Sequence, residues 1–341
     1  MRADDSGVSL SVIVVTYNSL RWLPALWASL QGQSRRGFQV VFFDNSSSDG
    51  TRDFTEQCDD ALTINSEQNI GFAAANNAAA RHATGSHLLF LNPDTRLEPN
   101  TVAEIFSCVE QFPEAILAPL QKSYDGEAVL TQGNGVDLLG YPTVSRDADR
   151  PFYADGAAMV CQARLFSRLG GFDEALFMFH EDIDLCWRAQ LFGHEVIRCG
   201  RAVVRHVSGA SAPGGAHRPG TRYRTTYFRR YNGEKNILRN LLKNYSALNC
   251  VWAIPLYLMQ QVCEMVVMCI SGRYDFARAD YNAIAWNIGN LRDTLETRSR
   301  VQQLRVIPDR KFFSRMTLRL SKVGLLRVLG LPSVHPESHA R

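Results

Sequence analysis

Hydrophobic runs of strand length alternate with helix-like segments along the first 110 residues. The run SLSVIVVTYN (9–18) is β-branched and apolar, and leucines recur at helical spacing over 20–30. The alternation continues with FQVVFFD, a helix near 51–58, a short strand and an alanine-rich helix within 61–85, HLLFL, and a helix over 97–112. Strands that alternate with helices predict an α/β fold, with a mostly parallel sheet covered on both faces.

Several of these predicted strands end in clusters of polar residues. The clusters are Thr16-Tyr17-Asn18, Asp44-Asn45-Ser46 and Asn92-Pro93-Asp94. Open α/β sheets bind their ligands just beyond the carboxyl ends of the strands. We therefore expect the three clusters to surround one ligand site.

The pattern changes after residue 120. Residues 121–150 are glycine-rich with mixed charge, which predicts a hairpin or loop across the sheet. A strand and a helix follow over 153–172, then a helix with Ile183, Trp187 and Leu191 on one face, and a short strand that ends on His206. Residues 211–224 are typical of a mobile glycine-rich loop, and the chain beyond about 221 is predicted to be helical and arginine-rich.

The segment 248–272 is the most apolar part of the chain and is long enough to span a membrane. Pro255, Gln260, Gln261 and Glu264 argue against a membrane span, because charged residues are costly in hydrocarbon. Two interpretations remain. In the first, the helix is amphipathic and packs on the rest of the protein or lies on a bilayer whose anionic lipids attract the flanking arginines and lysines. In the second, it is a buried helix of a soluble protein.

Composition excludes several classes of protein. The net charge of +3 indicates no particular partner, and the arginines are not interleaved with aromatic residues as in nucleic-acid-binding proteins. The eight cysteines form no CxxC pair and no zinc-ligand spacing, which favours reduced thiols in a cytosolic protein. The first ten residues lack the apolar core of a signal peptide, so we expect the chemistry to take place inside the cell.

The polar strand ends carry residue types suited to phosphate and sugar chemistry. Asp44 can accept hydrogen bonds from a base or ribose, Asn92 can bind a sugar, and Asp94 suits Mg²⁺ or Mn²⁺, which complete their shells with phosphate oxygens. His206 could add an imidazole ligand. Taken singly, each aspartate is also a common turn former or helix cap, and a histidine is more often a hydrogen-bonded core residue.

A second acidic group begins a predicted helix at His180-Glu181-Asp182-Ile183-Asp184. A carboxylate there could take the proton from an attacking hydroxyl group. The alternative is that Glu181 and Asp182 only complement the helix dipole. The recurrence of polar clusters at the ends of successive strands favours the functional interpretation.

The motifs VIVVTYN, FFDNSSSDGT, NIGFAAANN, LLFLNPDT, GAAMVCQARLFSRLGGFDEALFMFHEDIDLCWR and VVRHVSG resemble, in this order, the inverting glycosyltransferases of family two, most closely the rhamnosyltransferase-like branch. The resemblance covers 9–211 and implies a GT-A fold over 1–220, with a donor half to about 120, an acceptor half over 121–220, and a basic helical region over 221–341.

The implied reaction transfers a sugar from a nucleotide-diphosphate donor to a hydroxyl group with inversion. Rhamnose from dTDP-rhamnose is the expected donor, and the expected acceptor is a lipid-linked saccharide or a cell-surface glycan such as O-antigen or cell-wall polymer, at the inner face of the membrane. UDP-galactofuranose or UDP-glucose, and an inactive sugar-nucleotide-binding scaffold, are the alternatives. A nucleotidyltransferase would want a glycine-rich basic loop after the first strand, and TYNSLRW lacks one.

The resemblance also implies roles for individual residues. The expected nucleotide- and donor-binding residues are Thr16, Tyr17, Asn18, Asp44, Asn45, Ser46, Asp49, Asn69, Gly71, Phe72, Asn76, Asn92 and Asp94. Asp182 matches the catalytic base, with Glu181 as the fallback, and Gly156, Ala157 and Trp187 fall in the acceptor half. Asn92-Pro93-Asp94 stands where the family often has Asp-x-Asp, so Mn²⁺ or Mg²⁺ would rest on Asp94 and His206.

Overall fold

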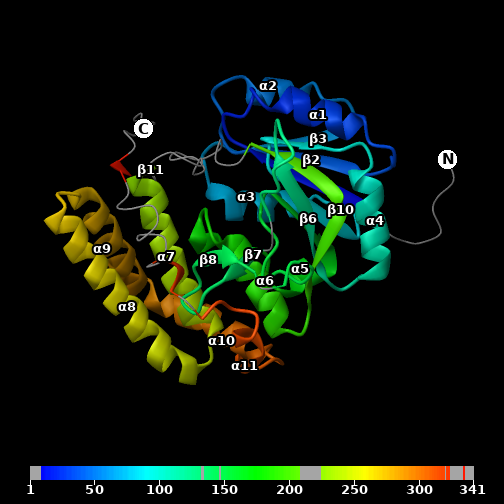
Figure 1. Cartoon of the computed structure of the whole chain (residues 1–341). Coiled ribbons are helices and arrows are strands. Elements are labelled where there is room, and N and C mark those ends of the chain that lie inside the picture. The colour runs from blue at the N-terminus through cyan, green and yellow to red at the C-terminus, as the bar shows by residue number, and fades with distance from the viewer. Residues whose placement is uncertain are drawn as a thin grey trace.

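An eight-stranded sheet forms the centre of the computed structural model, which describes residues 9–131, 134–145, 147–207, 224–318, 320–322 and 333–334. The strand order is β3-β2-β1-β4-β9-β6-β10-β5. The strands are β1 (Leu10–Thr16), β2 (Gln39–Asp44), β3 (Ala61–Asn65), β4 (His87–Leu91), β5 (Thr95–Leu97), β6 (Ile116–Ser123), β9 (Ala158–Gln162) and β10 (Val196–His206). The predicted α/β class is confirmed (Figure 1).

The sheet is more mixed in direction than the sequence pattern predicts. β3, β2, β1 and β4 pair in parallel, whereas β9 runs antiparallel to both of its neighbours, β4 and β6. No helix lies between β6 and β9 among the described residues, only the hairpin of β7 (Asn134–Val136) and β8 (Pro142–Val144). A chain that returns without a crossover helix pairs antiparallel. β5 is likewise antiparallel to β10.

Helices cover both faces of the sheet. Alternate residues of β1 enter two separate cores: Ile13 and Val15 pack on one face, Val12 and Val14 on the other. The first face is covered by α3 (Gly71–Ala80), α5 (Ala163–Arg168) and α6 (Glu181–Leu191), and the second by α1 (Leu23–Gln31) and α4 (Thr101–Gln111). Burial on both faces explains why these strands are continuously apolar.

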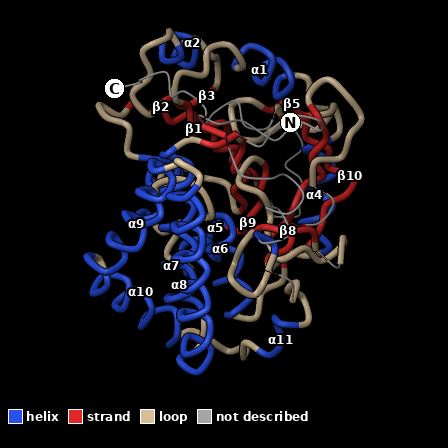
Figure 2. Tube along the Cα trace, turned by 60° about the vertical axis from the view of Figure 1, so that its left-hand side comes forward, coloured by secondary structure: helices blue, strands red, loops and turns tan. Residues whose placement is uncertain are grey.

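Five further helices form a group beside the sheet (Figures 1 and 2). They are α7 (Tyr227–Asn244), α8 (Ala247–Ile270), α9 (Tyr274–Gly289), α10 (Leu291–Gln303) and α11 (Arg310–Phe313). Ile237, Leu238 and Leu241 of α7 belong to the same hydrophobic core as α6. Helices α8, α10 and α11 contribute Tyr257, Val301 and Phe312 to this core, so the group is anchored on the sheet by several of its helices.

Two sequence expectations fall largely outside the described residues. Residues 208–223 are not described, and they include the predicted boundary near 220 and nearly all of the glycine-rich segment 211–224. The division into two parts at that point stays a prediction. Beyond it, the short strands β11 (Arg224–Thr225) and β12 (Ser333–Val334) pair in parallel.

Candidate active site

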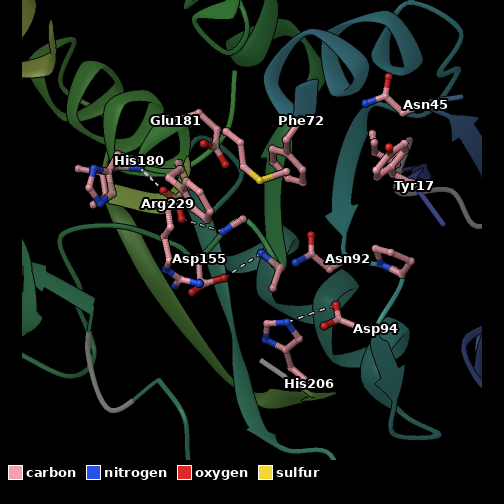
Figure 3. Close-up of a pocket in the computed structure, with 18 of the residues that line it drawn as sticks. Tyr17, Asn45, Phe72, Asn92, Asp94, Asp155, His180, Glu181, His206 and Arg229 are labelled. Atoms are coloured by element: carbon pink, nitrogen blue, oxygen red, sulfur yellow. Dashed lines mark hydrogen bonds and ion pairs between the residues drawn. The ribbon is translucent and has the colours of Figure 1, made fainter. Parts of the chain in front are cut away.

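A cavity of about 320 Å³ opens at the edge of the sheet where β1, β2 and β4 end (Figure 3). It gathers side chains from the loops after these strands, from the segment before β9, from the start of α6, from the end of β10 and from α7. The lining residues of the first sheet half include Tyr17, Asn45, Asn69, Phe72, Asn92 and Asp94. Those of the second half include Asp155, Gly156, Ala157, Glu181, Asp182, His206 and Arg229.

Eleven of the residues expected from the sequence line this one cavity. They are Tyr17, Asn45, Asn69, Phe72, Asn92, Asp94, Gly156, Ala157, Glu181, Asp182 and His206. The remaining eight lie around it or in the core: Thr16, Asn18, Asp44, Ser46, Asp49, Gly71, Asn76 and Trp187. Segments that are up to 190 residues apart in the sequence thus meet at one site, as the polar strand ends predict.

Asp44 holds the rim of the cavity together. Its carboxylate accepts hydrogen bonds from the Thr16 hydroxyl at 3.0 Å, from the Ser47 amide at 3.0 Å and from the Ser47 hydroxyl at 2.5 Å. Asp49 similarly accepts from the Leu20 amide at 3.1 Å and from the Thr51 hydroxyl at 2.6 Å. Both carboxylates therefore fix loop geometry in this structure, and their contact with a nucleotide stays a prediction.

Trp187 lies in the core and does not line the cavity. Its ring packs edge-on against Phe152 and Tyr245, with ring centroids 5.6 and 5.0 Å away. Asn76 is also buried, and its amide donates to the Phe72 carbonyl at 2.9 Å. Neither side chain lines this cavity, which differs from the donor contact expected for Asn76 and from the acceptor contact expected for Trp187.

Asp94 and His206 form one polar end of the cavity (Figure 3). The His206 Nε2 atom lies 3.4 Å from Asp94 Oδ1, and no hydrogen bond from the described residues reaches either oxygen of the buried Asp94 carboxylate. The His206 Nδ1 atom is 3.1 Å from Gln121 Oε1, which leaves Nε2 facing Asp94. Burial alone would lower the pKa of His206, but the adjacent Asp94 carboxylate raises it above its usual value.

These two side chains fit a divalent cation bound partly by substrate. A carboxylate without hydrogen-bond donors beside an imidazole nitrogen is a donor set that Mn²⁺ or Mg²⁺ accepts. The hydrogen bond from His206 Nδ1 to Gln121 would orient the ring, as partners of metal-binding histidines do. Within the described ranges, no group of three or more His, Cys, Asp or Glu side chains could hold a metal alone. Phosphate oxygens would therefore complete the shell.

The start of α6 supplies a second, differently built acidic group. The Asp182 carboxylate accepts hydrogen bonds from the Ile183 amide at 2.7 Å and the Gly156 amide at 3.0 Å. Burial, followed by the charge of Asp155, raises the pKa of Asp182 to about 7. Burial and the charge of Asp182 raise the pKa of Glu181 well above its usual value. Asp182 is thus the carboxyl that titrates near neutrality.

Asp155 is a functional candidate that the sequence analysis missed. It lines the cavity, and its carboxylate accepts from the Ala157 amide at 2.8 Å. Asp155 precedes β9, whose antiparallel direction puts its first residues at the same sheet edge as the ends of β1 and β4. The signal in the sequence is the carboxylate of YADG, which begins the strand-and-helix segment predicted from residue 153 instead of following a strand.

The loop leading into α6 has an unusual backbone. Phe177, Phe179 and His180 have φ values of 63°, 72° and 63°, in the left-handed region that costs energy for residues with a side chain. Asn236 of α7 stabilises the loop, because its side-chain nitrogen donates to the carbonyls of Leu176, Met178 and Phe179 at 2.9, 2.8 and 2.7 Å. Such strain is characteristic of functional sites.

Helix α7 also brings a positive charge into the cavity. Arg229 lines it, with the guanidinium 5.1 Å from the centre of the Phe179 ring. Figure 3 places Arg229 and Asp155 between the Asp94–His206 pair and Glu181. Arg229 was not predicted, because its segment reads only as an arginine-rich helix until the fold brings it to the sheet edge.

The mixed sheet flanked by helices is similar to the folds of solved GT-A structures. Solved structures confirm the fold: GalNAc-T7 with UDP, GalNAc and Mn²⁺ has a TM-score of 0.57 at 15% identity, over 70% of this chain and 48% of that one. The mannosyltransferase PcManGT from Pyrobaculum calidifontis, in complex with GDP-Man and Mn²⁺, has a TM-score of 0.52 at 18% identity, over 87% and 86%. Residues 11–175 match the family "Glycosyl transferase family 2", so the chain carries a domain of that family.

Curated relatives agree with this family. The low-salt glycan biosynthesis hexosyltransferase Agl10 of Haloferax volcanii is 26% identical over 203 residues, covering 56% of this chain and 64% of its own length. An N-acetylglucosaminyl-diphospho-decaprenol L-rhamnosyltransferase of Mycobacterium tuberculosis is 26% identical over 210 residues, covering 52% and 68%. The O-antigen chain rhamnosyltransferase WbaN of Salmonella anatum is 27% identical over 217 residues, covering 58% and 66%. The chain therefore spans only about two thirds of the length of these relatives.

Proposed function

We propose that the protein is an inverting glycosyltransferase that moves a sugar from a nucleotide-diphosphate donor to a hydroxyl group of a glycan or lipid-linked saccharide. One observation carries the proposal. The same cavity contains a possible cation site, formed by Asp94 and His206, and a carboxyl group with a pKa of about 7, that of Asp182. The family 2 domain supports it independently.

The first sheet half would bind the donor. Tyr17, Asn45 and Asn69 line the cavity beside the ends of β1, β2 and β3, where α/β sheets bind nucleotides. Asp94 and His206 would hold Mn²⁺ or Mg²⁺, which when bound neutralises charge on a leaving diphosphate. The structures of GalNAc-T7 and PcManGT, both with Mn²⁺, support this cofactor.

The second sheet half would act on the acceptor. Asp182 takes the proton of the acceptor hydroxyl while that oxygen bonds to the anomeric carbon and the bond from this carbon to the diphosphate breaks. A single displacement of this kind inverts the anomeric centre. A pKa of about 7 keeps Asp182 partly ionised and still basic at neutral pH. Burial and the charge of Asp182 raise the pKa of Glu181 well above its usual value, so its ionised form is disfavoured and Asp182 is the base we propose.

Rhamnose from dTDP-rhamnose is the donor sugar we propose, on the names of the relatives from M. tuberculosis and S. anatum. The same names support an acceptor on a lipid carrier or a surface glycan. We propose that this acceptor is reached from the cytoplasmic side of the membrane. Agl10, named a hexosyltransferase, supports the alternative of another hexose donor, such as UDP-glucose or UDP-galactofuranose. An inactive scaffold is disfavoured, because Asp94, Asp182 and His206 line the cavity and Asp44 is retained at its rim.

A thermal-shift screen tests the proposal. The full chain is heated with dTDP-rhamnose, UDP-galactofuranose, UDP-glucose or buffer, each with and without Mn²⁺. We expect one nucleotide sugar to raise the unfolding temperature, and to do so more strongly with Mn²⁺, since a ligand that binds only the folded state stabilises it. Absence of any shift by all three sugars at millimolar concentration would contradict these donors.

A further inference from the structure

Helix α8 exposes only uncharged side chains. The largest exposed ones are Leu248, Val251, Met259, Val262, Val266 and Ile270, which are between 51% and 83% exposed. They recur at helical spacing, so they form one stripe along a helix of 24 residues. At 1.5 Å per residue this stripe is roughly 35 Å long. A stripe of this length without a charge is unusual for a surface that faces water.

The polar residues of α8 face the protein interior instead. Glu264 is the only charged residue of the helix, and it pairs with Arg230 of α7 at 2.7 Å and with Lys322 at 2.6 Å. The Gln261 amide donates to Glu234 of α7 at 2.6 Å. Helices of proteins in water bury their apolar side, whereas α8 buries polar groups and exposes aliphatic ones. Helices in contact with lipid show this inverted polarity.

Helix α9 extends the apolar surface. It packs beside α8 in both views (Figures 1 and 2), and exposes Tyr274, Tyr281 and Ile288, each between 64% and 70%. Tyrosine combines an apolar ring with a polar tip, which suits the boundary between lipid and water. We call the exposed residues named for α8 and α9 the α8–α9 face.

Basic residues lie at both ends of α8. At its beginning, exposed Arg310 and Lys311 of α11 are held close by Asp309, which accepts from the Asn249 amide at 2.6 Å. Beyond its end, Arg278 is exposed on α9. Asp275 is the one exposed carboxylate in the first turn of α9. Positive charge around an uncharged stripe is complementary to the phosphates of anionic lipids.

We propose that the α8–α9 face rests on the surface of an anionic phospholipid bilayer. Helix α8 is long and apolar enough to cross a membrane by length and composition alone. A spanning position would separate Glu264 from Arg230 and Lys322 and leave buried charges unpaired, so the helix lies along the interface. A second copy of the chain fits this face less well. A typical protein–protein interface contains about one hydrogen bond per 100–200 Å², whereas the exposed side of α8 consists of aliphatic and small side chains that form none.

The contact goes beyond the proposed function and does not depend on it. Helix α7 connects the α8–α9 face with the cavity, since it packs on α8 and α9 and contributes Arg229 to the cavity lining. A membrane under the α8–α9 face therefore keeps the cavity close to the bilayer surface.

Vesicle sedimentation of the full chain tests the contact. One set of vesicles is phosphatidylcholine alone, and the other is an equal mixture of phosphatidylcholine and phosphatidylglycerol. We expect binding to the mixture, and much weaker binding to phosphatidylcholine alone or at high salt, where the charge attraction is screened. A chain that stays in the supernatant with both vesicles overturns the proposal.

Matched variants locate the contact. The double variant Val262→Glu, Val266→Glu should bind the mixed vesicles at least tenfold more weakly, since charge enters the apolar stripe. Lys311→Ala should bind about fivefold more weakly. Leu62→Glu, at a residue 41% exposed on the edge strand β3, is the control and should bind as the parent does. Circular dichroism checks that each variant is folded.

Light scattering of the same proteins separates the membrane from a second copy. We expect the parent and the double variant to have the same mass in solution. A parent dimer that the double variant converts to a monomer, without vesicle binding by the parent, would assign the face to self-association and overturn the proposal. Unchanged vesicle binding by the folded double variant would also overturn it.

Discussion

The two acidic ends of the cavity use the same residue type in opposite ways. Asp94 is buried beside an imidazole and receives no hydrogen bond from the described residues, so its charge is available to a cation. Asp182 is held by two backbone amides, and burial, followed by the charge of Asp155, disfavours its ionised form and raises its pKa to about 7. The neighbours of a carboxylate, more than its identity, decide whether it holds a metal or takes a proton.

The largest expected effect is the loss of turnover in Asp182→Asn. The two backbone amides of Gly156 and Ile183 donate to different oxygens of Asp182, so the asparagine oxygen can accept from one of them, and the side-chain amide cannot take a proton. Turnover should fall about 10²–10⁴-fold, the usual contribution of a general base. Initial rates with the donor found in the thermal-shift screen measure it, and rates like those of the parent would remove Asp182 from this role.

Asp94→Ala should instead weaken donor binding. Removing one of two protein ligands should raise the Kd of the nucleotide sugar, measured by calorimetry with Mn²⁺, by at least the ~10–100-fold seen when only a supporting partner of a metal ligand is lost. Asp59→Ala, at an exposed carboxylate outside the cavity, is the control. Equal donor affinity of Asp94→Ala and the parent with saturating Mn²⁺ would contradict the assignment.

Asp182→Asn should also make the folded protein more stable at pH 8. The pKa of Asp182 is raised on folding, so the folded state binds the proton more tightly. The stability that protonated Asp182 allows is therefore fully present at low pH. It is lost as the pH rises from the pKa of Asp182 in the unfolded chain through the folded-state pKa of about 7. The expected gain in the free energy of unfolding is on the order of 2–4 kcal/mol at pH 8, and should vanish near pH 4. Urea unfolding at both pH values measures this gain. A loss of stability at pH 8 would show that ionisation of Asp182 does not destabilise the folded state.

Asp155→Asn should have the smallest effect, a shift of the pH dependence. The charge of Asp155 helps to raise the pKa of Asp182, and removing it should move the acidic limb of the pH–activity profile to lower pH. Burial is the larger cause, so the shift should be less than about 1 pH unit. A limb that stays in place or moves to higher pH would show that Asp155 does not act on Asp182.

The parallel part of the sheet and its rim could be predicted from the sequence because both are local patterns. Apolar runs that end in polar residues identify β1, β2 and β4, and with them Tyr17, Asn45 and Asp94. β6 was missed because Pro119 interrupts its apolar run, and β5 because it has three residues. Propensity is a weak guide for strands this short or interrupted.

The remaining features depend on contacts between distant segments. Asp155 enters the cavity only because β9 runs antiparallel, and strand direction is not encoded in local periodicity. Trp187 is predicted to lie near the acceptor but lies in the core against Phe152 and Tyr245, on a helix whose residues are all buried except the half-buried Asp182. The inward side of α8 is set by Arg230 and Lys322, which lie far from it in the sequence.

Anomalous X-ray diffraction from crystals grown with Mn²⁺ and a nucleoside diphosphate tests the central claim most directly. We predict one manganese peak between the Asp94 carboxylate and the His206 imidazole, with the nucleotide against Tyr17 and Asn45 and Asp182 across the same cavity. A nucleotide bound there without manganese at Asp94, or manganese bound beside Asp182 and Asp155 instead, would contradict it.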